Sequence, residues 1–227
     1  MFINASSAWL ATFPGAHVGA LLMQHVANAE PSPALEAALA ELQAELRREF
    51  AAASRADLLA LPTVAAYQRH YRAFGQTYHV LRQLESVALK GRPLASPGGS
   101  LVSAMFGAEL RSLLLTAGHD ADALAGDLLV DCSREGDTFV GIGGQEYVLK
   151  AGDMLIRDQR GIISAVLHGP DQRTRLVPSA QRALFVTYAP AGIPAAAVRT
   201  HLEHLASLVR LAAPSARTAS LTLLPPE

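Results

Sequence analysis

The sequence has a single cysteine and lacks any long apolar run. Cys132 on its own cannot form an internal disulfide, and one cysteine also excludes a cysteine-rich zinc site. No stretch of about 18 apolar residues is present, so we expect no membrane span. The first residues lack a basic segment followed by an apolar core and a small-residue cleavage site. This predicts a chain without a signal peptide that works in the cytoplasm.

An excess of positive charge is also missing. The chain has 19 Lys and Arg against 20 Asp and Glu, a net charge of −1. A protein that wraps duplex nucleic acid is normally more basic. We therefore expect no DNA partner, and we expect any contact with RNA to be weak, local or confined to one face.

The size and composition favour one compact domain. Half of the 227 residues are hydrophobic and 17% are charged, which is typical of a chain with a large core. We expect a single domain over residues 1–213 and a flexible tail over residues 214–227. Both a monomer and a homodimer are compatible with this composition.

The residue patterns predict strands at both ends of the chain and helices in its middle. Strands are expected at 2–3, 9–13 and 18–26. Ser32 and Pro33 begin the first helix, whose apolar stripe reaches Phe50, and further helices are expected over about 62–74, 79–90 and 101–115. Later strands are expected near 127–132, 138–142, 145–149, 153–157, 161–167 and 182–188, followed by a helix after Pro194.

This order predicts an α/β (α+β) fold in layers around one core. The sheets are expected to be mixed and largely antiparallel, with a mid-chain helical segment and a C-terminal helix. We expect the N-terminal strands to join the C-terminal sheet.

Polar and charged residues gather where one buried strand is expected to end. The apolar run 161–167 leads into the corner His168-Gly-Pro-Asp-Gln-Arg-Thr174. Binding and catalytic groups are commonly carried by loops on a rigid scaffold. Together with the segments 126–130, 136–140 and 151–158, this corner resembles the B3/B4 domain of the bacterial phenylalanyl-tRNA synthetase beta subunit.

The resemblance covers about residues 60–190 and implies a layered B3/B4-like domain that stands alone. In the synthetase this domain is the editing module, which hydrolyses tRNA charged with the wrong aromatic amino acid. The resemblance implies aminoacyl-tRNA or its 3′ end as the partner, and it implies no cofactor. Asp171 takes the place of a glutamate that recognises the amino acid. Ala117 stands where the synthetases carry a histidine, and His119 is its near neighbour.

Ester hydrolysis needs a positioned water and donors for the developing oxyanion, but neither a covalent nucleophile nor a metal. The candidate catalytic residues are Asp171, to hold the substrate ammonium group or orient water, His168 as general base, and Thr174 as a hydroxyl donor. The candidate substrate-binding residues are Gly169, His119, Arg173 and Arg157. Backbone N–H groups near Gly169 and of residues 171–173 are candidate oxyanion donors.

Each of these groups also has an ordinary structural interpretation. Gly-Pro-Asp is favoured turn chemistry, in which the aspartate caps its own backbone, and His119 is suited to the negative end of a preceding helix. His168 can be a strand-end residue, and the arginines can form surface ion pairs. His201 and His204 can be half of a metal site, but a solvated helix face is favoured because no third ligand is evident.

Three functions follow from these alternatives. The first is an aminoacyl-tRNA deacylase, and the second is a noncatalytic module that binds an amino acid or a tRNA end. The third is an unrelated small-molecule protein that shares only the fold. The first needs an open pocket that contains Asp171, the second needs the same pocket without hydrolysis, and the third predicts a closed pocket or an unrelated ligand. Whether His168 and Asp171 share one pocket is left open by the sequence.

Overall fold

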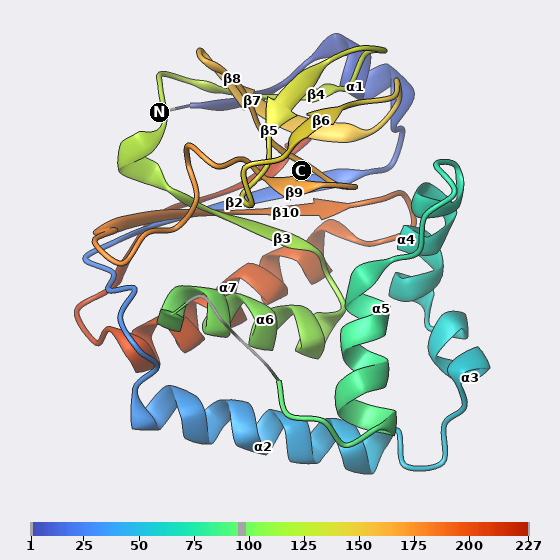
Figure 1. Ribbon diagram of the computed structural model, residues 1–227, viewed down its shortest axis with the longest axis vertical. Helices are drawn as coiled ribbons and strands as arrows, with labels where there is room; N and C mark the ends of the chain where they lie inside the picture. Colours follow the sequence, from blue (N-terminus) through green and yellow to red (C-terminus); the bar gives the residue numbers. More distant parts are fainter. Residues whose placement is uncertain (1, 95–98, 227) are drawn as a thin grey trace.

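Two sheets and a hairpin form the upper layers of the computed structural model, which describes residues 2–94 and 99–226 (Figure 1). The first sheet has the strand order β1-β4-β7-β8-β9 and is antiparallel except for the β1–β4 pair. Its strands are β1 (Ile3–Ala5), β4 (Leu128–Cys132), β7 (Met154–Asp158), β8 (Gly161–Ala165) and β9 (Gly169–Pro170). The hairpin of β5 (Thr138–Val140) and β6 (Glu146–Val148) packs on β7 and β8 through Phe139.

The second sheet lies in the middle of the molecule. Its order is β11-β2-β10-β3, and all its pairs are antiparallel. The strands are β11 (Arg217–Leu224), β2 (His17–Gln24), β10 (Arg182–Ala189) and β3 (Thr116–Asp120). Nearly every residue of β2 and β10 is buried, because the sheet is covered on both faces.

Helices α6 (Gly99–Ser112) and α7 (Ala195–Ala212) cover this sheet on the face away from the first sheet, and α2 (Pro33–Glu49) lies beneath them (Figure 1). A Cβ atom on Gly19 would lie 2.6 Å from the Val198 side chain, so α7 packs directly on the backbone of β2. Short helices flank the layers: α1 (Ser7–Thr12), α3 (Arg55–Ala60), α4 (Pro62–Arg72), α5 (His79–Leu84), a π-helical turn (Glu85–Leu89) and a 3₁₀ turn (Ala121–Ala123). Among residues 2–94 and 99–226, no helix combines the length and apolar character that a membrane span requires.

The mixed, layered fold expected from the sequence is confirmed. The six later strands and the C-terminal helix lie where they were expected, and Ser32 caps α2 by accepting a hydrogen bond from the Leu35 N–H at 3.2 Å. The strand expected at 9–13 is wrong, because this segment forms α1. Ser6 caps that helix by accepting a hydrogen bond from the Trp9 N–H at 3.0 Å, and Trp9 is its only buried residue.

Two further expectations are wrong at the edges of the second sheet. The helix expected to reach residue 115 ends at Ser112, and Thr116–Asp120 forms β3 against β10. The tail expected to be flexible over 214–227 contains β11, which pairs with β2 over Arg217–Leu224. Leu223 and Leu224 are each only 7% exposed, so the end of this strand contributes to the core.

A buried polar network joins the helices to the second sheet. His201 on α7 lies 2.7 Å from the Ser112 hydroxyl through Nδ1 and 2.7 Å from the Thr116 hydroxyl through Nε2. Thr116 lies in turn 2.9 Å from the Thr187 hydroxyl on β10. Burial lowers the pKa of His201 to about 3, so the ring is neutral at pH 7.

We expect Leu223→Ala to lower the free energy of unfolding by about 2–4 kcal/mol, because it removes a buried side chain from β11. Ser220→Ala, at an exposed position of the same strand, should change it by less than about 0.5 kcal/mol. Urea unfolding followed by circular dichroism measures both. Equal, small effects would mean that β11 is not part of the folded core.

We also expect His201 to make folding sensitive to acid. Between about pH 6.5 and pH 3 the unfolded chain binds a proton at this ring and the folded chain does not, so stability falls as the pH drops through this window. His201→Gln removes this titration and should make the pH dependence shallower, by up to about 1.4 kcal/mol per pH unit. Urea unfolding at stepped pH values tests this, and an unchanged slope contradicts a neutral buried ring.

Candidate functional site

The polar corner lies where the two sheets and the hairpin meet. The Asp171 N–H donates to the Ile163 carbonyl on β8 at 2.7 Å, and the Gln172 N–H donates to the Val140 carbonyl on β5 at 2.9 Å. The Asp120 N–H on β3 donates to the Thr174 carbonyl at 2.7 Å. Residues 171–174 therefore have their backbone held from three sides.

The Asp171 side chain closes this corner. It is 5% exposed, and its Oδ1 accepts hydrogen bonds from the Thr174 N–H at 3.0 Å and from the Thr174 hydroxyl. The Thr174 oxygen lies 2.7 Å from Nδ1 of His119 on β3. Because the hydroxyl proton points to a carboxylate, this oxygen accepts a hydrogen bond from the Nδ1–H group of His119. The turn interpretation of Asp171 therefore holds for one of its two oxygens.

His119 is fully buried, in β3 and not at a helix end, so its assignment to a helix terminus is wrong. Burial, and to a lesser degree the nearby Arg173, lower the pKa of His119 to about 3. The ring is therefore neutral at pH 7. Its Nε2 atom has no hydrogen-bond partner among the residues that the structure describes.

Arg173 is held in place by Asp158, at the end of β7. Its two terminal nitrogens reach the two carboxylate oxygens of Asp158 at 2.9 and 3.0 Å, and one of them also donates to the Ala123 carbonyl at 2.9 Å. Burial alone would raise the pKa of Asp158, but hydrogen bonds from Arg173 and from two backbone N–H groups outweigh it and lower the pKa. The Nε atom of Arg173 lies 3.6 Å from Oδ2 of Asp171.

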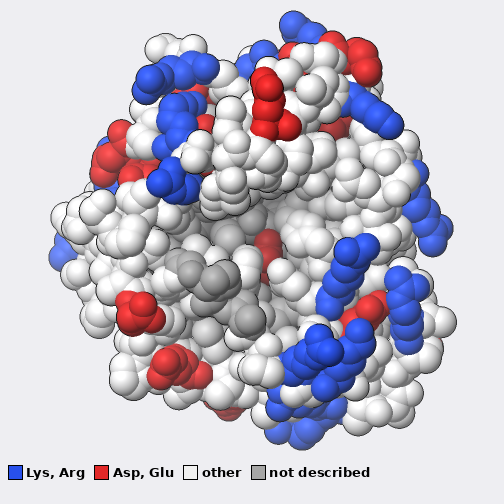
Figure 2. Space-filling model, viewed as in Figure 1, with Lys and Arg blue, Asp and Glu red and all other residues white. Residues whose placement is uncertain are grey.

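A hollow of about 490 Å³ opens beside these groups. It is lined by residues from the hairpin, the β7–β8 turn and the corner: Thr138, Phe139, Val140, Arg160, Gly161, Ile162, Asp171, Gln172, Arg173 and Arg175. One carboxylate thus faces three guanidinium groups. Figure 2 shows Lys and Arg side chains gathered at the upper left of the face in view, near β8, and again at the lower right.

The structure brings four of the expected site residues together: Asp171, Thr174, His119 and Arg173. Sequence reasoning gave Asp158 no functional role. The available signal was its position, since it borders the tight turn between β7 and β8, where the Arg160 N–H donates to it at 2.8 Å.

The other expected residues lie elsewhere. His168 lines a separate hollow of about 110 Å³ together with Asp153, and its ring stacks on Tyr147 with centroids 4.4 Å apart. Gly169 lies in β9, where it pairs with Ala165 of β8, and it is not part of the lining of the Asp171 hollow. Arg157 on β7 lies 3.6 Å from a carboxylate oxygen of Asp131 and outside the lining of the Asp171 hollow.

The expectation of backbone oxyanion donors needs correction at Asp171 and Gln172. The N–H groups of Asp171 and Gln172 already donate hydrogen bonds to the carbonyl oxygens of Ile163 and Val140. They cannot receive a developing negative charge without breaking the sheet junction. The side-chain donors that line this hollow are the three arginines together with Thr138 and Gln172.

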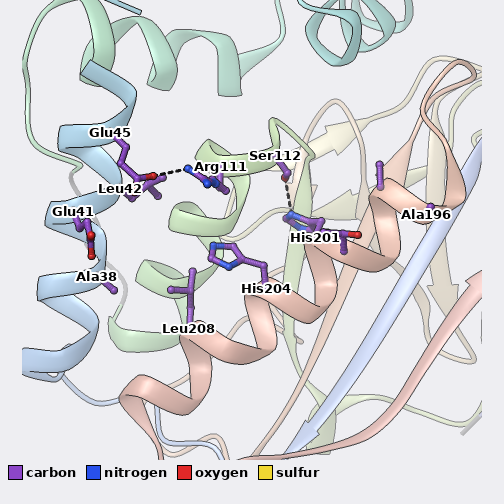
Figure 3. A pocket seen from close by; sticks show the side chains of 12 residues that line it. Ala38, Glu41, Leu42, Glu45, Arg111, Ser112, Ala196, His201, His204 and Leu208 are labelled. Carbon is purple, nitrogen blue, oxygen red and sulfur yellow. Dashed lines mark hydrogen bonds and ion pairs between the residues drawn. The ribbon is translucent and has the colours of Figure 1, made fainter. Parts of the chain in front are cut away.

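A larger hollow, of about 770 Å³, lies among α2, α6 and α7 (Figure 3). Arg111 pairs there with Glu45 at 2.6 Å, and His201 points to Ser112. The expectation that His201 lies on a solvated face is wrong, because it is 2% exposed. In the described part of the chain, no group of three or more His, Cys, Asp or Glu side chains is placed to hold a metal ion.

Comparison with known proteins identifies the region around the corner. Residues 110–209 match the model of the B3/4 domain. The phenylalanine–tRNA ligase beta subunit of Mycoplasma genitalium is 31% identical over 67 residues, which cover 30% of this chain and 8% of that protein.

A solved structure shares the fold. An N-terminal fragment of the phenylalanyl-tRNA synthetase beta subunit from Pyrococcus horikoshii superposes with a TM-score of 0.50 over 99% of this chain and 54% of the fragment, at 8% identity. The chain thus spans about half of that fragment and a small part of the curated relative. The resemblance predicted from the polar corner is confirmed: the chain is related to the B3/4 domain of phenylalanyl-tRNA synthetase beta subunits.

Proposed function

We propose that this chain binds the aminoacyl end of tRNA in the hollow beside Asp171 and hydrolyses the ester of wrongly charged tRNA. One observation carries the proposal: in a B3/4 domain, a carboxylate faces a hollow lined by three arginines. The names of the relatives supply the substrate class, since both belong to synthetases for phenylalanine and tRNA.

The two oxygens of Asp171 have different roles in this proposal. Oδ1 is engaged by Thr174, whereas Oδ2 accepts no hydrogen bond from the described residues and has only Arg173 nearby, at 3.6 Å. Oδ2 can therefore accept a hydrogen bond from the substrate ammonium group or from a water molecule. Thr174 and His119 are both fully buried. They act as positioning residues that aim the carboxylate.

The arginines suit the remaining charges of the substrate. Guanidinium groups bind phosphate oxygens through paired hydrogen bonds, and they stabilise negative charge as it develops on a carbonyl oxygen. Arg173 is already oriented by Asp158, so its position is preorganised. Arg160 and Arg175 are exposed, which leaves them accessible to the phosphates of an acceptor end.

The reaction follows ordinary ester chemistry. A water oxygen adds to the carbonyl carbon, the bond from that carbon to the ribose oxygen breaks, and the ribose oxygen leaves with a proton. The free amino acid and the uncharged tRNA are the products. We assign His168 no part in this step, because it lines the other hollow.

A noncatalytic binding module is the second candidate. The backbone N–H groups of Asp171 and Gln172 are engaged within the sheets, so the corner has no free pair of backbone donors at these positions. This arrangement favours recognition without turnover. The two candidates share the pocket and differ only in hydrolysis.

We expect Asp171→Asn to reduce kcat/KM for deacylation at least about 100-fold, because it removes the negative charge while keeping the side-chain shape. The measurement is release of labelled amino acid from a panel of preformed aminoacyl-tRNAs. Thr174→Val should lower the rate through Asp171, whereas Thr174→Ser, which retains the hydroxyl, should largely restore it.

Glu203→Gln is the matched control, since Glu203 is an exposed carboxylate on α7 outside the hollow. Circular dichroism checks that each variant is folded. Hydrolysis that survives Asp171→Asn would remove Asp171 from the mechanism. Saturable binding across a panel without turnover would support the binding module.

A further inference from the structure

A second cationic surface lies on the helical side of the molecule. Residues 47–92 contain eight Lys and Arg against three Asp and Glu, a net charge of +5, whereas the whole chain has a net charge of −1. All eight cationic residues are exposed. Figure 2 shows Lys and Arg gathered at the lower right of the face in view, where Figure 1 places α5 and the end of α2.

Contacts between the helices bring parts of this surface together. Arg47, at the end of α2, donates to the Val87 carbonyl at 3.3 Å and to the Gly91 carbonyl at 2.9 Å. Arg55 on α3 pairs with Glu85 at 2.7 Å, in the same π-helical turn as Val87. We call the exposed cations around these contacts the helical basic surface: Arg48, Arg55, Arg72, Arg82, Lys90 and Arg92.

A polar hollow of about 380 Å³ lies within this surface. Arg55 and Arg72 line it, together with Gln68, Gln76 and Thr77. No carboxylate lines it, and within the described part of the chain Arg72 forms no ion pair. Its guanidinium group is therefore available to an anion.

Gln68 is the unusual group in this hollow. The residue is 8% exposed, and its Oε1 atom is buried without a hydrogen-bond partner among the described residues. This oxygen is an acceptor, so a water molecule or another donor can satisfy it and a phosphate oxygen cannot. The NH₂ group of the same amide is the part that can donate to a phosphate oxygen, in a hollow that two guanidinium groups also line.

We propose that this hollow and the helical basic surface bind the phosphodiester backbone of RNA without reading its base sequence. The inference rests on the proposed function for one point, namely that the nucleic acid is RNA. It does not depend on hydrolysis, and it concerns residues outside the 110–209 region that matches the B3/4 domain. The hollow would hold one phosphate, and the exposed cations around it would meet its neighbours along the strand.

Binding of uncharged tRNA by the full chain, followed by fluorescence anisotropy over a series of salt concentrations, tests this inference. We expect Arg72→Glu to raise the dissociation constant at least about 10-fold. It should also reduce the slope of log K against log salt by about 1, as expected for loss of one phosphate contact. Gln68→Leu should weaken binding by a smaller factor, because it removes a neutral donor.

Arg217→Glu is the matched control, because it makes the same change in net charge at an exposed position on β11 outside the helical basic surface. We expect it to change the dissociation constant by less than about 3-fold. Equal losses in the two variants would mean that only net charge matters, and they would overturn the proposal. An unchanged affinity in Arg72→Glu would also overturn it.

Two further measurements separate this proposal from the proposed hydrolysis and from a site for a small anion. A 3′-aminoacyl-adenosine lacks the backbone, so Arg72→Glu should leave its hydrolysis unchanged while lowering kcat/KM for aminoacyl-tRNA. If the wild type hydrolyses neither ester but Arg72→Glu still weakens tRNA binding, the proposed activity fails and the backbone site stands. Saturable binding of inorganic phosphate that is lost in Arg72→Glu without a change in tRNA affinity would assign the hollow to a small anion instead.

Discussion

One carboxylate, that of Asp171, holds the corner on which the candidate site depends. Its Oδ1 atom closes the turn by accepting hydrogen bonds from Thr174. The Thr174 hydroxyl oxygen in turn accepts a hydrogen bond from His119 in the second sheet. The backbone of the same residue is bonded to the first sheet, and the next residue is bonded to the hairpin. Without this carboxylate, the buried Thr174 hydroxyl would lose the acceptor of its proton, and the hydrogen bond from His119 to that hydroxyl would lose its support, which is costly in a low-dielectric interior.

This structural role limits what the corner can do chemically. One oxygen and two backbone N–H groups are committed to the fold, so Oδ2 and the side chains of the arginines, Thr138 and Gln172 are the polar groups of the lining left to meet a ligand. Asp158 further restrains Arg173. The polar lining is thus buried or half-buried and hydrogen-bonded on the side of Asp171 and Arg173, whereas Arg160 and Arg175 are exposed, and Arg175 donates to the Gln172 carbonyl at 2.7 Å. In the proposed function, the first pair would recognise the amino acid and the exposed pair would contact the phosphate backbone.

The sequence predicted the elements whose signals are local. Ser32 and Pro33 mark the start of α2 correctly, and the glycine-punctuated strands after residue 127 lie where the pattern placed them.

The sequence pattern failed where pairing partners decide the structure. Thr116–Asp120 is polar for a buried strand. Its Thr116 and His119 side chains are buried because they find hydrogen-bond partners on other elements: Thr187 and His201 for Thr116, and Thr174 for His119. Only the last two residues of β11 are buried, so its alternation was too weak to reveal a strand. The position of His168 outside the Asp171 hollow depends on how the hairpin packs, which no local pattern encodes.

Net charge was a poor guide to where charge lies. A total of −1 conceals a helical segment of +5, so the remainder of the chain carries −6. Screening limits the reach of exposed charges to about 10 Å at ordinary ionic strength. A polyanion near the short helices therefore experiences those cations and little of the distant acidic residues. The segment 47–92 also lies outside the region that matches the B3/4 domain. The match to that domain therefore says nothing about the charge of this segment.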